Sequence, residues 1–136
     1  MIVRGTTPYH TFILPLKVEN IDTLYITYLQ NNEVILDKAY NSSGVEITDT
    51  DFETENANME NLVDNEINTD EESLSKITVH LTQEETLKFH FYPAAEKNIA
   101  VVQVRVLDTN GEAYASNPVR ERIFGVLKDG VISNEH

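Results

Sequence analysis

Apolar and polar residues alternate most regularly between residues 76 and 107, and this stretch predicts much of the fold. Residues 77–81 have an apolar side chain at every second position, which is the period of a half-buried strand. Residues 87–92 repeat that alternation, so the two runs predict a hairpin centred near Glu85. Residues 98–107 are the most apolar run of the chain and predict a central strand.

The link between the first two runs carries a helix start signal. Thr82 is followed three residues later by Glu85, a spacing that fits a capping box. In that motif each side chain accepts a hydrogen bond from the backbone N–H of the other residue. One helical turn or a tight connection is therefore expected there.

Further segments show strand patterns with turn signals between them. Asn31-Asn32 and Asn110-Gly111 mark two hairpin turns, because Asn and Gly tolerate a positive φ. The expected strands are 9–16, 21–30, 33–40, 112–116 and 119–127, with short apolar pairs at 2–3 and 131–132. About seven short strands predict an all-β fold, namely a single antiparallel β-sandwich of the immunoglobulin-like type over residues 1–136.

The negative charge of the chain is concentrated in one segment. The formal net charge is −13 over 136 residues, from 23 acidic and 10 basic side chains. Residues 41–75 contain eleven acids and no Lys or Arg, so the remainder has 12 acids against 10 bases and a net charge of −2. Because no basic residues cluster in the sequence, nucleic-acid binding is not expected.

Residues 41–75 are predicted to be a long acidic insertion between strands, since 35 residues exceed the length of an ordinary loop. Their composition permits disorder. Two groups of apolar residues nevertheless predict local order, as an edge strand and a short amphipathic helix. The first group is Val45, Ile47 and Phe52, and the second is Met59, Leu62, Val63 and Ile67.

Cysteine and long apolar runs are both absent from the chain. Without cysteine, disulfides, thiol chemistry and thiolate metal sites are excluded. No run approaches the ~18 apolar residues of a membrane span. The N-terminus shows no signal-peptide pattern. No membrane is expected as a partner.

Carboxylates at alternate positions in residues 49–55 raise the question of a calcium site. An EF-hand loop needs Gly at its sixth position and a bidentate Glu at its twelfth. This segment has no Gly and places Phe52 and Thr54 between its acids. A solvated acidic loop is therefore the preferred interpretation.

His80 and His90 would lie nearly opposite each other if the predicted hairpin formed. Cross-strand neighbours of this kind can share a metal ion. Zinc needs a third or fourth ligand, and the sequence indicates none, so exposed strand histidines or an interface patch are preferred. If this face meets a partner, protonation near a pKa of ~6.5 would modulate the contact.

Catalytic motifs are missing. No G-x-S-x-G, H-E-x-x-H or glycine-rich phosphate loop occurs. We therefore expect that the protein is not an enzyme, that no residue is catalytic, cofactor-binding or metal-binding, and that no cofactor is needed. Residues 41–43 match a glycosylation sequon. Tyr25, Tyr92 and Tyr114 are expected either in an interface or in sheet packing.

Several stretches together resemble small proteins encoded in the structural modules of tailed bacteriophages and prophages of Gram-positive hosts. The stretches are MIVRGTTP (1–8), LYITYLQ (24–30), LTQEETL (81–87), VQVRV (102–106) and LKDGVI (127–132). The resemblance covers most of the chain outside 41–75, where the family has a shorter link between strands. It implies a virion or virion-assembly protein with a β-sandwich. It assigns no functional residue of that family to a position in this chain.

From this resemblance we expect a non-enzymatic virion structural protein. It would be a capsid decoration, a connector, or a tail- or baseplate-associated adaptor that binds other virion structural proteins. Its location would be the virion, after synthesis in the host cytoplasm, and a homo-oligomer is left open. The alternative is a carbohydrate- or host-surface-binding β-sandwich module. A small hydrolase or metal enzyme is a third hypothesis that no residue spacing supports.

Overall fold

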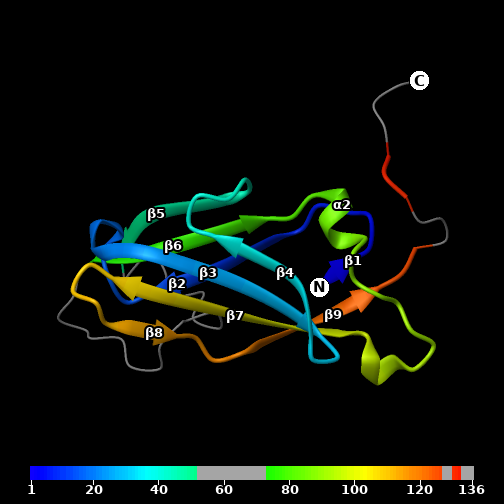
Figure 1. Ribbon diagram of the computed structural model, residues 1–136. Coiled ribbons are helices and arrows are strands. Elements are labelled where there is room, and N and C mark those ends of the chain that lie inside the picture. The colour runs from blue at the N-terminus through cyan, green and yellow to red at the C-terminus, as the bar shows by residue number, and fades with distance from the viewer. Residues whose placement is uncertain (52–72, 127–129, 133–136) are drawn as a thin grey trace.

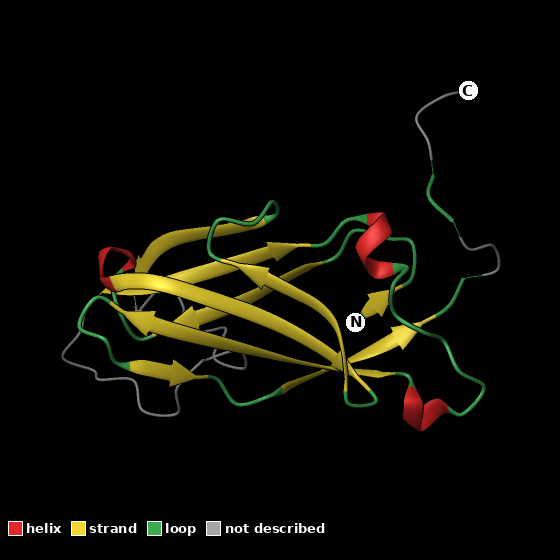
Figure 2. Cartoon of the chain, in the orientation of Figure 1, coloured by secondary structure: helices red, strands yellow, loops and turns green. Residues whose placement is uncertain are grey.

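Nine strands and three short helical turns make up the described chain. The computed structural model describes residues 1–51, 73–126 and 130–132. The strands are β1 (Ile2–Val3), β2 (Tyr9–Leu14), β3 (Ile21–Gln30), β4 (Glu33–Ala39), β5 (Val45–Asp51), β6 (Ser73–His80), β7 (Ile99–Asp108), β8 (Ala113–Ala115) and β9 (Val119–Phe124). The helical turns are η1 (Val18–Asn20), α2 (Gln83–Thr86) and η3 (Ala95–Lys97). The predicted all-β class is confirmed (Figure 2).

The strands form two sheets (Figure 1). The larger sheet has the order β1-β9-β7-β3-β4, and β8 also pairs with β7. The smaller sheet has the order β2-β6-β5. All pairs are antiparallel except β1 with β9, which are parallel. The predicted central position of β7 is confirmed, because β7 lies between β3 and β9.

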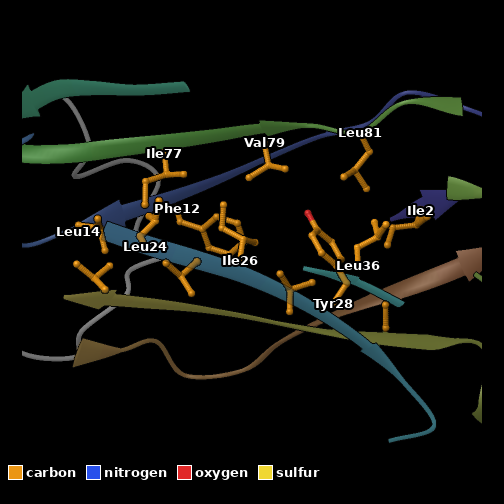
Figure 3. Packing of buried hydrophobic residues seen from close by; sticks show 14 of the residues in the cluster. Ile2, Phe12, Leu14, Leu24, Ile26, Tyr28, Leu36, Ile77, Val79 and Leu81 are labelled. Atoms are coloured by element: carbon orange, nitrogen blue, oxygen red, sulfur yellow. The ribbon is translucent and has the colours of Figure 1, made fainter. Parts of the chain in front are cut away.

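The core lies between the two sheets. Every second residue of β3 and of β7 is buried, as the alternation predicted. Figure 3 shows the inner residues of the smaller sheet facing those of β3. They include Phe12 and Leu14 from β2, Ile77 and Val79 from β6, and Leu24, Ile26 and Tyr28 from β3. Burial of each large apolar side chain stabilises the fold by about 1.5–3 kcal/mol.

Two hairpins form where turns were predicted, but the residues of the two turns adopt different backbone conformations. Asn31 and Asn32 have φ angles of 52° and 65°, so both central residues of the β3–β4 turn are left-handed. In the β7–β8 turn only Gly111 has a positive φ, of 85°. The expectation that Asn110 would share it was wrong, because the Asp108 carboxylate accepts the N–H groups of Asn110 and Glu112 and builds a longer loop.

The hairpin predicted from residues 77–81 and 87–92 does not form. β6 pairs with β2 and β5 instead, and residues 87–92 contain no strand. The predicted capping box is present: Thr82 Oγ1 accepts from the Glu85 N–H at 3.1 Å, and Glu85 Oε1 accepts from the Thr82 N–H at 2.9 Å. The resulting turn of α2 carries the chain away from the smaller sheet, so the second run never reaches the first.

Side-chain amides hold the segment that follows α2. Gln30 Oε1 accepts from the His90 N–H at 2.8 Å, while its Nε2 donates to the carbonyls of His90 and Lys97. Asn98 makes a matching pair with the backbone N–H and C=O of Tyr92. Both amides are buried, and they supply the hydrogen bonds that a neighbouring strand would otherwise provide.

The strand count exceeds seven partly because the strand that pairs with β7 on the side away from β3 is interrupted. β8 and β9 both pair with β7, and the break between them contains Ser116. The Ser116 N–H donates to the Val104 carbonyl, and Ser116 Oγ accepts from the Val104 N–H. This side-chain contact keeps the ladder hydrogen-bonded across the break before Pro118.

Several predictions concern chain ends and the acidic segment. The edge strand is confirmed over Val45–Asp51 as β5, whereas Phe52 and the helix predicted from Met59 to Ile67 lie outside the described residues. Residues 131–132 form no strand. The backbone N–H and C=O of Ile132 instead bond to the side-chain amide of Gln83.

Replacing Gln30 with leucine should destabilise the protein by about 1–3 kcal/mol, because three backbone groups would lose their partner in a part-buried site. Urea unfolding would measure the loss, and hydrogen exchange at the His90 amide should accelerate. Gln103→Leu is the matched control, since that amide makes a single bond, to the Ser116 carbonyl. Equal losses in the two variants would contradict this role of Gln30.

Candidate functional surfaces

The two histidines considered as a metal pair lie at different places. His80 ends β6 and stacks on Tyr9 of β2, with ring centroids 4.0 Å apart and planes 6° from parallel. His90 follows α2, where its ring lies near Tyr92. The predicted cross-strand pairing of His80 and His90 is wrong, because the hairpin that would have created it does not form.

The acidic stretch considered for calcium is only partly described. Asp49 and Asp51 lie on β5, and one Asp49 oxygen accepts the Val18 N–H at 3.3 Å. Residues 52–55 lie outside the described residues. Within residues 1–51, 73–126 and 130–132, no three His, Asp or Glu side chains are grouped so as to hold a metal ion.

The three tyrosines proposed for an interface occupy unlike positions. Tyr25 is 41% exposed on the outer face of the larger sheet. Tyr92 is half-buried and lies under the ammonium group of Lys97. The Tyr114 hydroxyl donates to Glu112 Oε2 at 2.8 Å, and this bond, with the nearby Asp108, raises its pKa to about 12. Tyr25 is therefore the one of the three that presents a large exposed surface.

Arginine and aromatic side chains lie in two groups along that outer face: Arg105 beside Tyr25, and Arg120, Arg122 and Phe124 on β9, which pairs with the other end of β7. Buried and outward-facing residues alternate along β3, β7 and β9. Because the strands are paired in register, their outward-facing residues lie on the same face of the sheet. The Arg105 guanidinium lies 5.7 Å from the Tyr25 ring, and that of Arg122 lies 5.8 Å from the Phe124 ring. We call this surface the arginine face and define it as Tyr25, Arg105, Arg120, Arg122 and Phe124.

The arginine face is a stripe of positive charge on a strongly acidic chain. It holds three of the four arginines, whose numbers in the sequence give no sign that they share a sheet face. The arginines are spread along the sheet, with Arg105 four residues along β7 from the partner of Arg120. β-sheet register was the missing signal, because it alone places residues 105, 120 and 122 on one side.

A cleft of about 510 Å³ lies at one end of the arginine face. Tyr25 and Arg105 form one wall, and the small side chains of Ala113 and Ala115 leave the opposite side open. Arg105 stands between Tyr25 and Ala115 in the cross-strand row. An inserted side chain from another molecule would thus meet an aromatic ring and a guanidinium group together.

A second hollow, of about 310 Å³, lies on the outer face of the smaller sheet. Its lining comprises Tyr9, Gly44, Val45, Glu46, Thr78 and His80. Tyr9 is 65% exposed although it stacks on His80. The sequence predicted that His80 would be exposed on a strand, but not that Tyr9 would be its neighbour, because this pairing joins residues 71 positions apart.

A buried ion pair joins β4 to α2. Lys38 Nζ lies 2.8 Å from Glu85 Oε2, and the Lys38 side chain is only 7% exposed. Burial acts to raise the pKa of Glu85, but hydrogen bonds from Lys38 and from the Thr82 N–H outweigh it. The pKa of Glu85 therefore lies below its ordinary value of 4.5. Glu85 serves both the helix cap and the contact of α2 with β4.

A histidine–tyrosine pair is buried in the core. His10 Nδ1 and the Tyr28 hydroxyl are 2.7 Å apart, and Tyr28 contacts Phe89 edge-on. Burial lowers the pKa of His10 below its ordinary value of 6.5, although Glu121 opposes that shift. Burial likewise raises the pKa of Tyr28 well above its ordinary value. Both groups are therefore neutral inside the fold near pH 7.

Comparisons with known proteins yield no relative: no protein-family model, no curated protein and no solved structure matches this chain. Among the described residues, no helix is long and apolar enough to cross a membrane.

Lys38→Met should destabilise the protein by about 1–3 kcal/mol, because Glu85 would lose its partner while remaining part-buried. Thermal and urea unfolding would measure the loss. Lys17→Met, at an exposed position, should change stability by less than about 0.5 kcal/mol. Adding Glu85→Gln to Lys38→Met should cost less than the two single losses combined; additive losses would show that the pair does not couple.

The free energy of unfolding should fall as pH drops below about 6.5, because His10 must gain a proton in the unfolded chain before it does in the fold. The slope should approach about 1.4 kcal/mol per pH unit at most. Glu85 adds its own loss only below about 4.5, so urea unfolding between pH 7 and 5 isolates His10.

The control is His10→Gln, which keeps a hydrogen-bonding group for the Tyr28 hydroxyl but does not titrate. Its unfolding free energy should be nearly constant over the same pH range. A His10→Gln variant with the full pH slope of the unaltered protein would show that another group carries it.

Proposed function

We propose that this protein is a non-enzymatic structural protein of a tailed bacteriophage particle that acts through protein–protein contacts. It would be a capsid decoration, a connector, or a tail- or baseplate-associated adaptor, located in the virion after synthesis in the host cytoplasm. The resemblance of residues 1–8, 24–30, 81–87, 102–106 and 127–132 to small virion proteins supports this assignment. The arginine face is the structural observation that carries the protein-contact part of it.

The composition of the arginine face favours a protein partner. Tyr, Phe and Arg are enriched at the centres of protein interfaces, where arginine binds carboxylates with a planar fork of donors. Arg105 and Arg122 each lie over an aromatic ring, which limits their conformations before any partner binds. Because the face is built on paired strands, its side chains are held on a rigid support. An acidic surface of another virion subunit would complement it.

We further propose that the two-sheet fold is of the immunoglobulin-like type. In that fold strands B, E and D form one sheet, and strands G, F, C and C′ form the other. The orders β2-β6-β5 and β9-β7-β3-β4 agree with these two sheets when β2 is taken as strand B. The short parallel contact of β1 with β9 extends the larger sheet at its edge.

A carbohydrate- or host-surface-binding module is the second candidate function. The specific observation in its favour is the hollow on the smaller sheet, which is lined by the exposed Tyr9 and by Glu46 among other residues. That hollow and the arginine face belong to different sheets, so the two functions are compatible.

Mass spectrometry of purified intact particles from the source phage or induced prophage tests the proposed location. Copies near those of the major capsid protein would indicate a decoration, and a few to a dozen copies a connector or tail component. Absence from clean particles, with the protein present only in the lysate, would overturn the virion assignment.

Incorporation of an Arg105→Ala/Arg122→Ala variant tests the arginine face. We expect about tenfold or greater loss from particles, because central arginine and aromatic contacts dominate binding energy at interfaces. Lys17→Ala, which removes an exposed cation elsewhere, should be incorporated normally. Normal incorporation of a folded double variant would exclude the arginine face as the contact.

A further inference from the structure

We propose that the hollow at Tyr9 and His80 is a binding site for a neutral saccharide residue. The ligand would place the apolar face of its pyranose ring on the exposed side of Tyr9. Its hydroxyl groups would bond to the Glu46 carboxylate and the Thr78 hydroxyl. This inference deepens the second candidate function and is independent of the arginine face.

The stacked pair makes Tyr9 a preorganised platform. Tyr9 and His80 are direct cross-strand partners on β2 and β6, and their rings lie 4.0 Å apart and nearly parallel. One side of the Tyr9 ring is therefore covered by the imidazole, which fixes its orientation. Yet Tyr9 remains 65% exposed, which sheet packing alone does not explain. A ring that is fixed on one side and open on the other suits an aliphatic ring face.

Gly44 brings the start of β5 against the end of β6 at the edge of the hollow. It has a φ of +84°, and a Cβ atom at this position would lie 2.4 Å from the His80 carbonyl oxygen. The His80 N–H donates to the Gly44 carbonyl at 2.7 Å, so the two backbones are held in contact. Only glycine permits this close approach of the two backbones, which forms one wall of the hollow.

The polar groups around the hollow define the ligand class. Glu46 lies opposite Thr78 in the β5–β6 ladder, so a carboxylate acceptor and a hydroxyl stand on one row. A carboxylate can accept two hydroxyl protons, as adjacent sugar hydroxyls would offer. Among the described residues, Glu46 is the only carboxylate that lines the hollow. Because the chain has a net charge of −13, acidic sugars would be repelled. A neutral pyranose such as glucose or N-acetylglucosamine fits both requirements.

Amide NMR titrations of the full chain with three trisaccharides test this site. The probes are cellotriose, tri-N-acetylchitotriose and a trimer of galacturonic acid. We expect saturable shifts at residues 44–46, 78 and 80 with at least one neutral trimer, and at least tenfold weaker binding of the acidic one. No saturable shift with either neutral trimer up to about 10 mM would overturn the proposal. Binding of the acidic trimer alone would do the same.

Two variants separate this site from general surface binding. Tyr9→Ala should weaken binding at least tenfold, and Glu46→Gln, at an exposed strand position, should weaken it severalfold without altering the fold. Phe91→Ala removes another exposed aromatic ring outside the hollow and should bind as the unaltered protein does. If folded Tyr9→Ala or Glu46→Gln bound the neutral trimer as tightly as the unaltered protein does, the proposed site would be wrong. Particle mass spectrometry is unaffected by either result, so the two assignments fail separately.

Discussion

Backbone polar groups that leave the sheets still need hydrogen-bond partners, and the arrangement of the chain depends on how that need is met. A buried N–H or C=O without a partner costs about 1–3 kcal/mol, a large share of a small domain's stability. Three side chains form the hydrogen bonds that a neighbouring strand would otherwise provide: those of Gln30, Asn98 and Ser116. They hold the segment after α2 and the break between β8 and β9. The central strands β3 and β7 keep one register from the Thr23–Leu107 pair to the Gln30–Ala100 pair, with a shift only between Ile21 and Thr23.

That fixed register determines what each outer face presents. On the larger sheet it brings Arg105 beside Tyr25 and places Arg122 with Phe124 on the same side. On the smaller sheet it brings Tyr9 beside His80. Both faces therefore carry aromatic rings whose orientation is set by a neighbour in the adjoining strand or along the same strand. Preorganisation of this kind lowers the entropy lost on binding, whichever partner each face receives.

The acidic side chains of β5 and the arginine face lie on different sheets. β5, an edge strand, carries Glu46, Asp49 and Asp51, whereas the opposite sheet carries the arginine face. Charged residues on an edge strand hinder its pairing with another chain. Contact through an outer face is thus favoured over strand addition at β5. The proposed virion role agrees with this, since a subunit in a particle must bind its neighbours without open-ended strand pairing.

The sequence by itself determined the all-β class, the inward positions of β3 and β7, the Asn31-Asn32 turn and the Thr82–Glu85 cap, because each depends on residues close along the chain. Alternation could not say whether residues 87–92 would pair with β6. The cap turned the chain away from β6, and the Gln30 side chain formed hydrogen bonds with the backbone of His90. The arginine face and the Tyr9–His80 hollow were likewise decided only by the tertiary structure. Each joins residues from strands far apart in sequence, and register between such strands is set by packing of the common core.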